Sequence, residues 1–299
     1  MQIIDLHGIF PPIATPFENG EVALDKLADN VAKLSQTGIA GIVALGSNGE
    51  SVFLSEKEKR DVIRTVVGAV PDGMPVIAGS ACESAVETIR LTCDSADLGA
   101  RAALLTRPHY YGGKMSDTAL RRFYTTVADN VPIPVLLYNV PKFTHLTLSA
   151  ATVAGLSEHP NITGIKDSSG NLNLVGQYLN ESGDAFSVLV GSGGVLFGGL
   201  SLGCVGGILA LANVAPRACV EILELVHQGN YEKAKAMQLR MIPVNLAVTA
   251  TYGISGLKAA MDMLGYFGGE PRLPLLPATD EDRAEIRNIL VRAGLLLER

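Results

Sequence analysis

Two stretches of this chain, IPVLLYNVP at residues 133–141 and ITGIKDSSG at residues 162–170, indicate its architecture. Each begins as an apolar run and ends in polar residues followed by a proline or a glycine. An apolar run without alternation is typical of a parallel strand that is buried on both faces. The residues between the two stretches carry helix signals, so we expect two parallel strands joined by a helix.

The same pattern recurs along most of the chain. Eight apolar runs, mostly about thirty residues apart, match the repeat length of a (β/α)8 barrel. A doubly wound sheet is the alternative, but it usually has fewer strands, and no GxGxxG sequence opens the first helical segment. The runs are residues 9–14, 41–45, 75–78, 102–105, 133–138, 162–166, 188–190 and 205–209.

The segments between the runs predict helices. Ser55 with Glu58, and Ser84 with Glu87, match the capping box that starts a helix. Gly38 is a predicted stop after the first helix. The interval between the last two runs is short, so the seventh helix is expected to be short as well.

The pattern changes near Tyr231, where three helical segments follow one another at residues 231–248, 255–264 and 280–297. We therefore expect a catalytic barrel domain at residues 1–228 and a C-terminal helical extension at residues 229–299 that packs on the barrel. A chain of 299 residues with 47% hydrophobic content can bury a core of this size.

Composition narrows the function. The net charge is -6 and the basic residues are scattered, which argues against nucleic-acid binding. The four cysteines form no CxxC pair and no zinc spacing, so we interpret them as reduced residues of a cytoplasmic protein. The most apolar stretch, residues 188–211, is broken by glycines, and the N-terminus lacks a signal-peptide pattern. We expect no membrane partner.

Lys166 is the most informative residue, because barrel active sites lie at the C-terminal ends of the strands. Strand side chains alternate, so Ile162, Gly164 and Lys166 are predicted to share the interior face, with Asp167 pointing outward in a structural role. Burial favours the neutral amine, which is the form that attacks a carbonyl. A strand-end lysine that reaches solvent is the alternative.

Other strand ends supply groups that suit a 2-oxo acid. Tyr138 closes its run and can transfer protons, although a core tyrosine is the simpler interpretation. Ser47 and Asn48 lie between glycines, where N–H and hydroxyl groups can bind a carboxylate. The glycine-rich loop at residues 191–194 instead fits a phosphate, so a barrel that binds a phosphorylated ligand without a Schiff base is a competing hypothesis.

Together these motifs resemble the dihydrodipicolinate synthase and N-acetylneuraminate lyase superfamily. GSNGE at residues 46–50, YNVP at 138–141 and GIKDSSG at 164–170 occur in the family's order, and the likeness runs from GIFPPIATPF at 8–17 to GYFGGEPRLPLLP at 265–277. The resemblance implies a class I lyase or aldolase that holds a 2-oxo acid such as pyruvate as a Schiff base. It implies no metal and no organic cofactor.

The resemblance also implies a role for each site residue. Lys166 matches the Schiff-base lysine and Tyr138 the proton-transferring tyrosine. Ser47 matches the hydroxyl that links Tyr138 to a second tyrosine, Tyr111, which in the family comes from a neighbouring subunit. Ser47 and Asn48 also match the carboxylate-binding pair. A homotetramer built as a dimer of dimers is therefore expected.

Substrate choice depends on smaller differences. Dihydrodipicolinate synthases carry an arginine after YNVP for the carboxylate of the second substrate, whereas Phe143 stands at that position here. An apolar ring cannot replace a bidentate guanidinium. The stretches GSNGE, GSACES, YYGGKMS and KDSSG look most like the 4-hydroxy-2-oxoglutarate aldolases, which release pyruvate and glyoxylate. That likeness gives Ser168 and Gly191 substrate-contacting roles.

Besides the phosphate-binding barrel, the sequence leaves three alternatives open. Within the family they are 4-hydroxy-tetrahydrodipicolinate synthase, which condenses pyruvate with aspartate semialdehyde, and aldolases of 2-keto-3-deoxy sugar acids. Lys142 could replace the missing arginine in part and so favour the synthase. Outside enzymology, a ligand-binding barrel without turnover is the third possibility, although Lys166, Tyr138, Ser47 and Tyr111 are all present.

Overall fold

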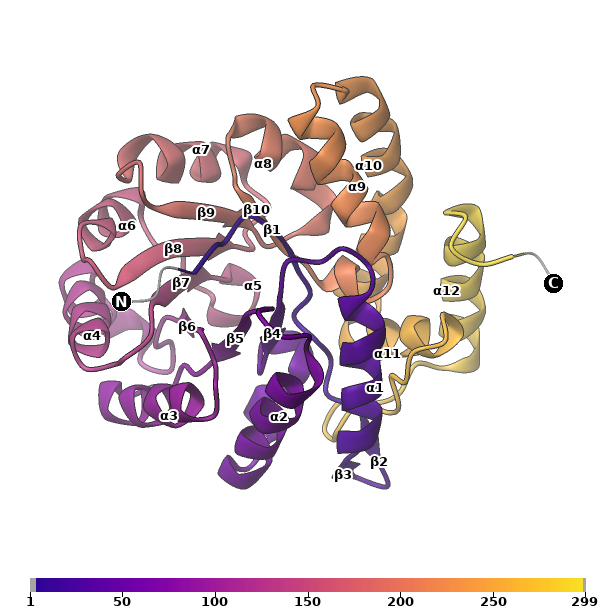
Figure 1. The fold of residues 1–299 in the computed structure, drawn as a ribbon, viewed down its shortest axis with the longest axis horizontal. Coiled ribbons are helices and arrows are strands. Elements are labelled where there is room, and N and C mark those ends of the chain that lie inside the picture. Colours follow the sequence, from indigo (N-terminus) through magenta and orange to yellow (C-terminus); the bar gives the residue numbers. More distant parts are fainter. Residues whose placement is uncertain (1–3, 298–299) are drawn as a thin grey trace.

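A barrel of eight parallel strands forms the centre of the computed structural model, which describes residues 4–297 (Figure 1). The strands follow the order β1-β10-β9-β8-β7-β6-β5-β4, and an isolated parallel bridge from Pro12 to Val43 joins the two ends. All eight runs form strands, so the prediction of a (β/α)8 barrel is confirmed. The strands are β1 (Gly8–Phe10), β4 (Ile42–Ala44), β5 (Val76–Gly79), β6 (Ala102–Thr106), β7 (Val135–Asn139), β8 (Ile162–Asp167), β9 (Ser187–Val190) and β10 (Gly206–Ile208).

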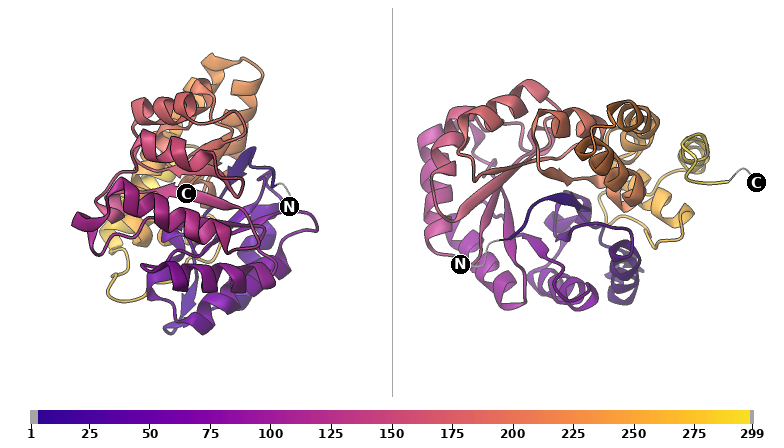
Figure 2. Two further views of the ribbon diagram at one scale, coloured as in Figure 1. Left: turned by 90° about the vertical axis from the view of Figure 1, so that its left-hand side faces the viewer. Right: turned by 45° about the horizontal axis from the view of Figure 1, so that its top comes forward.

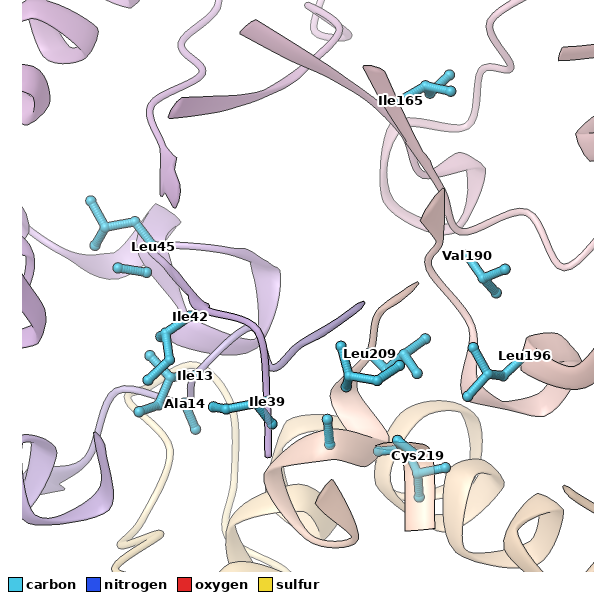
Figure 3. Packing of buried hydrophobic residues seen from close by; sticks show 14 of the residues in the cluster. Ile13, Ala14, Ile39, Ile42, Leu45, Ile165, Val190, Leu196, Leu209 and Cys219 are labelled. Atoms are coloured by element: carbon cyan, nitrogen blue, oxygen red, sulfur yellow. The ribbon is translucent and has the colours of Figure 1, made fainter. Parts of the chain in front are cut away.

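The strands divide their side chains between two clusters because successive residues point to opposite faces. An inner cluster comes almost entirely from the strands and fills the barrel, with Phe10, Leu136, Tyr138 and Leu189 among its members. A larger outer cluster packs strands against helices. Figure 3 shows part of the outer cluster, including Ile42, Ile165 and Val190 from strands and Leu196 and Cys219 from helices.

One predicted face is wrong. Ile162 belongs to the outer cluster with Ile165, not to the interior face of Lys166. The register explains this, because Val135 pairs with Ile162 whereas the next residue of β7, Leu136, pairs with Gly164. The extra residue in β8 is a bulge that shifts the alternation by one position. From Gly164 onward the predicted faces hold.

Helices surround the barrel and begin mostly where capping residues indicate. Ser55 and Glu58 form a reciprocal capping box, whereas Ser84 only accepts a hydrogen bond from the Glu87 N–H. The seventh barrel helix, α8, is short, as predicted. The helices are α1 (Leu24–Ser35), α2 (Glu56–Ala69), α3 (Ala85–Asp97), α4 (Asp117–Asp129), α5 (Pro141–Thr144), α6 (Ala150–Ser157), α7 (Leu172–Glu181), α8 (Leu196–Leu202) and α9 (Pro216–His227).

A small hairpin outside the barrel was not predicted. Strands β2 (Phe17–Glu18) and β3 (Glu21–Val22) pair antiparallel across Asn19 and Gly20. Both turn residues have positive φ, as a type I′ turn requires, and Asn-Gly is the usual sequence for that turn.

Three further helices lie on one side of the barrel (Figure 2). They are α10 (Tyr231–Leu246), α11 (Gly253–Met263) and α12 (Asp280–Arg292), and a short π-helix, η6 (Ala247–Thr251), follows α10. The last helix ends before residue 297, earlier than predicted. The division of the chain at residues 228 and 229 stays a prediction, and residues 1–3 and 298–299 of its two ranges lie outside the described part.

Within residues 4–297, no helix combines the length and apolar character needed to cross a bilayer.

Candidate active site

Lys166 and Tyr138 lie side by side at the C-terminal ends of β8 and β7. The register pairs the two residues directly, so their side chains point to the same inner face of the barrel. Lys166 is 3% exposed, and its Nζ lies 4.1 Å from the centre of the Tyr138 ring. The alternative in which Lys166 reaches solvent is therefore wrong. An amine and a phenol meet inside a closed apolar wall.

The surroundings of Tyr138 favour loss of its proton. Burial raises the pKa of this phenol. The positive charge of Lys166, together with hydrogen bonding to the side chains of Ser47, Ser168 and Lys166, lowers the pKa by more than burial raises it. The pKa of Tyr138 is therefore below the usual value for tyrosine. A phenol of lowered pKa beside an amine can exchange a proton with it or with a bound substrate.

Ser47 and Asn48 begin a short 3-10 helix, η1 (Ser47–Gly49), directly after β4. N–H groups in the first turn of a helix have no partner within that helix, so they are free to bind an anion. Two non-glycine residues with positive φ, Leu45 and Glu50, bracket this loop. Hydrogen bonding with the Ser47 side chain is one of the causes that lower the pKa of Tyr138, so Ser47 lies near the phenol.

Ser168 and Gly191 meet at the ends of β8 and β9. A Cβ added to Gly191 would overlap the Ser168 Oγ and would lie 2.7 Å from the Asp167 carbonyl oxygen, so only glycine fits here. The Ser168 side chain is also among the causes that lower the pKa of Tyr138, so it lies near the phenol. The structure therefore brings five of the predicted site residues, Lys166, Tyr138, Ser47, Ser168 and Gly191, into one group, with Asn48 next to Ser47.

Asp167 points outward, as predicted, and it orders the loop that follows β8. Its two carboxylate oxygens accept hydrogen bonds from Asn139 Nδ2 at 2.6 Å and from Ser169 Oγ at 2.6 Å. Burial raises the pKa of this carboxyl group, which these hydrogen bonds partly offset. Asn139 in turn accepts the Leu148 N–H, so this side chain joins the loops after β7 and β8.

Tyr111 is not part of this group within a single chain. It lies in the loop after β6 with 72% of its surface exposed, and its ring packs edge-on against Tyr110. Tyr111 is not among the groups that shift the pKa of Tyr138, whereas Ser47 and Ser168 are. The neighbouring His109 pairs with Glu83 at 2.9 Å, outside the inner cluster.

Phe143 lies on α5 and is 50% exposed. Lys142 does not replace the arginine that the family resemblance would place there, because its Nζ donates to the Thr249 carbonyl oxygen at 2.7 Å.

The loop after β9, which could have bound a phosphate, is held by a side chain from another helix. Gln238 from α10 donates to the Gly193 carbonyl oxygen and accepts a hydrogen bond from the Phe197 N–H. This N–H, which a phosphate would need, is therefore already used.

Sequence reasoning missed one buried ion pair next to the site. Lys258 of α11 contacts Glu50, the last residue of GSNGE, at 2.7 Å, and both side chains are 1% exposed. No local signal marks Lys258, because it lies in an ordinary apolar helix. Among residues 4–297, no group of three His, Cys, Asp or Glu side chains is arranged to hold a metal ion.

Comparisons with known proteins find relatives along nearly the whole chain. The model of the dihydrodipicolinate synthetase family matches residues 5–293. The 4-hydroxy-tetrahydrodipicolinate synthase of Methanothrix thermoacetophila is 39% identical over 288 residues, which cover 96% of each chain. The enzyme of the same name from Methanocaldococcus jannaschii is 34% identical over 290 residues, covering 97% of this chain and 99% of the relative.

A solved structure shows the same fold. The dihydrodipicolinate synthase of Acinetobacter baumannii, solved as a complex with pyruvate, superposes with a TM-score of 0.93 at 31% identity, covering 98% of this chain and all of that one. These relatives carry the synthase name, so cleavage of 4-hydroxy-2-oxoglutarate stays a prediction.

Proposed function

Since this chain belongs to the dihydrodipicolinate synthetase family, and is therefore a class I lyase of the pyruvate aldolase type, we propose that Lys166 forms a Schiff base with the ketone of a 2-oxo acid. The observation that supports this most is the buried Lys166 amine with Tyr138 beside it. A lysine without water around it is a nucleophile, and a phenol next to it can handle the protons of the reaction.

Imine formation uses groups that the fold holds in place. Tyr138, with its lowered pKa, takes a proton from Lys166, and the neutral amine attacks C2 of the 2-oxo acid. Ser47 and Asn48 hold the substrate carboxylate and fix the direction of attack. The resulting carbinolamine loses its hydroxyl as water when Tyr138 returns the proton, which leaves a protonated imine on Lys166.

The bond-breaking step follows from the imine. With 4-hydroxy-2-oxoglutarate, Tyr138 removes the proton of the C4 hydroxyl, the C3–C4 bond breaks, and its electron pair moves into the imine to give an enamine. Glyoxylate leaves. Protonation of the enamine carbon and hydrolysis of the imine then release pyruvate and restore Lys166. In the reverse direction the same enamine attacks an aldehyde.

For the acceptor, we propose glyoxylate rather than aspartate semialdehyde. Phe143 supplies no charge for a second carboxylate, and Lys142 is engaged with the Thr249 carbonyl oxygen. Ser168 and Gly191 contact each other at the ends of β8 and β9, and the likeness to 4-hydroxy-2-oxoglutarate aldolases gives both residues substrate-contacting roles. The names of the relatives favour the second candidate, 4-hydroxy-tetrahydrodipicolinate synthase.

We further propose that Tyr111 completes the site of a neighbouring subunit in a homotetramer. Its exposed position on a loop, next to the exposed Tyr110, suits a side chain that inserts into a partner.

For the location of the protein we propose the cytoplasm, because the four cysteines are unpaired thiols.

Reductive trapping tests the Schiff base. Pyruvate and borohydride should give an irreversible adduct on the peptide that contains Lys166, detected by mass spectrometry. A Lys166→Met protein should give no adduct, whereas Lys142→Met, which changes a lysine outside the barrel interior, should still be trapped. Normal turnover by a folded Lys166→Met protein would refute the proposal.

A product assay tests the acceptor. The wild-type enzyme should cleave 4-hydroxy-2-oxoglutarate, with glyoxylate measured directly, and should condense pyruvate with aspartate semialdehyde far more slowly. Phe143→Arg should improve use of aspartate semialdehyde, because it adds a carboxylate-binding group. Faster condensation than cleavage by the wild-type enzyme would instead assign the synthase reaction.

A further inference from the structure

The ion pair between Glu50 and Lys258 joins the loop that carries Ser47 and Asn48 to the C-terminal helices. The Lys258 Nζ lies 2.7 Å from Glu50 Oε1, donates to the Glu270 carbonyl oxygen at 2.9 Å, and sits 4.3 Å from the centre of the Phe17 ring. A buried ammonium with these partners has one defined position. It is not a surface charge that solvent could replace.

Groups from the C-terminal part of the chain contact both carboxylate oxygens of Glu50. While Lys258 contacts Oε1, the backbone N–H of Arg272 donates to Oε2 at 2.8 Å. Arg272 itself is fixed, since its guanidinium lies 4.4 Å from the centre of the Phe17 ring. Both oxygens of the Glu50 carboxylate are therefore held by groups from the C-terminal part of the chain.

The backbone of the loop explains why such fixation is needed. Glu50 joins η1 to a second 3-10 helix, η2 (Ser51–Phe53), and has a φ of 53°. Leu45, at the other end of the loop, has a φ of 58°. Left-handed conformations are unfavourable for residues other than glycine, so tertiary contacts must hold them. Thr15 contributes one by donating to the Gly49 carbonyl oxygen at 2.7 Å.

We propose that Lys258 is a positioning residue for catalysis, which acts through Glu50 to hold Ser47 and Asn48 in the geometry that binds the carboxylate of the 2-oxo acid. This inference rests on the proposed function, since it needs that loop to be the carboxylate site. Lys258 does not touch the substrate. Without the pair, the strained loop relaxes and substrate binding weakens, while the chemistry at Lys166 is retained.

The test separates binding from chemistry. Borohydride trapping of pyruvate is measured against pyruvate concentration in the wild type, Lys258→Met, Glu50→Gln and the double variant. We expect each variant to raise the half-saturating pyruvate concentration roughly 10- to 100-fold. The amount trapped at saturation should stay close to that of the wild type.

A matched control removes an equally buried hydrogen-bonded contact elsewhere in the chain. Asn30 of α1 exchanges two hydrogen bonds with the backbone of Phe267, at 2.8 and 2.9 Å, and so also holds the C-terminal segment to the barrel. Asn30→Ala should lower the melting temperature without moving the half-saturating concentration. Glu50→Gln is nearly isosteric, and the double variant leaves no lone buried charge, so these two are the variants to rely on if Lys258→Met fails to fold.

The outcomes are distinct. If the wild type is trapped on Lys166 and the folded Glu50→Gln and double variants bind pyruvate within about twofold of it, the positioning role is wrong and the Schiff-base proposal stands. A comparable increase of the half-saturating pyruvate concentration in Asn30→Ala would also overturn the inference. Any loosening of the C-terminal segment would then be enough to weaken pyruvate binding. Failure of the wild type to be trapped would refute the proposed function itself.

Discussion

The contact between Glu58 and Arg272 predicts a specific loss of stability in acid. The Arg272 guanidinium forms a bidentate interaction with the Glu58 carboxylate, at 2.6 and 3.1 Å, and Glu58 Oε2 also accepts the Ser55 N–H at 2.8 Å. The hydrogen bond from Arg272 is the main cause that lowers the pKa of Glu58 to about 2, against burial, which raises it. Glu58 lies in the first turn of α2 and Arg272 in the segment after α11, so the pair joins two distant parts of the chain.

The sign and size of the effect follow from this pKa. A carboxyl group whose pKa is lower in the folded state stabilises the protein above its unfolded pKa, and that stabilisation is lost as pH falls through the folded value. The difference between 4.5 and about 2 corresponds to about 3 kcal/mol. The Glu58 side chain is 21% exposed, and solvent screening reduces the expected contribution to about 1–3 kcal/mol.

Urea unfolding measures this contribution. Glu58→Gln should lower the free energy of unfolding by about 1–3 kcal/mol at pH 7, and its difference from the wild type should fall to about half or less at pH 3. Glu232→Gln is the control, because that side chain is 88% exposed and should show no such difference. A Glu58→Gln difference that stays constant from pH 7 to pH 3 would show that the ion pair is not its source.

Three further predictions concern the active site. Tyr138→Phe should lower turnover of the proposed substrate by about 10²–10⁴-fold, measured as glyoxylate release, because the proposed general acid–base is lost; near-normal turnover would assign proton transfer elsewhere. Gly191→Ala should raise the KM for the 2-oxo acid, since its Cβ would displace Ser168, and an unchanged KM would place the substrate away from this contact. Tyr111→Phe should lower turnover much more than Tyr110→Phe, and equal effects would argue against a role for Tyr111 in a partner's site.

Local pattern was enough to predict most of the barrel. Each strand is an apolar run with its own boundaries, so short-range sequence determines where it lies. The errors came from features that depend on pairing. The face of Ile162 changed because β8 carries a bulge that only its register with β7 reveals. The hairpin at Asn19 and Gly20 did carry a turn signal, but its strands are too short to show alternation.

The candidate site likewise contains residues that local pattern predicts and one residue that depends on a distant partner. Lys166 and Tyr138 could be placed together because they end neighbouring strands on the same face. Ser47 followed from its position after another strand. Lys258 could not be predicted, because its partner Glu50 lies far away in the sequence and a buried lysine in an apolar helix has no distinguishing pattern.

The position of Lys258 and Arg272 has a consequence for biosynthesis. The ribosome makes both groups that hold Glu50, on Lys258 and Arg272, long after the GSNGE segment, since Arg272 follows Glu50 by 222 residues. An unfinished chain can build strands and helices, but its Ser47–Asn48 loop is left without these anchors. Tight binding of the 2-oxo acid should therefore appear only after Lys258 and Arg272 have emerged and docked, so that chains interrupted before Lys258 bind the cell's 2-oxo acids weakly.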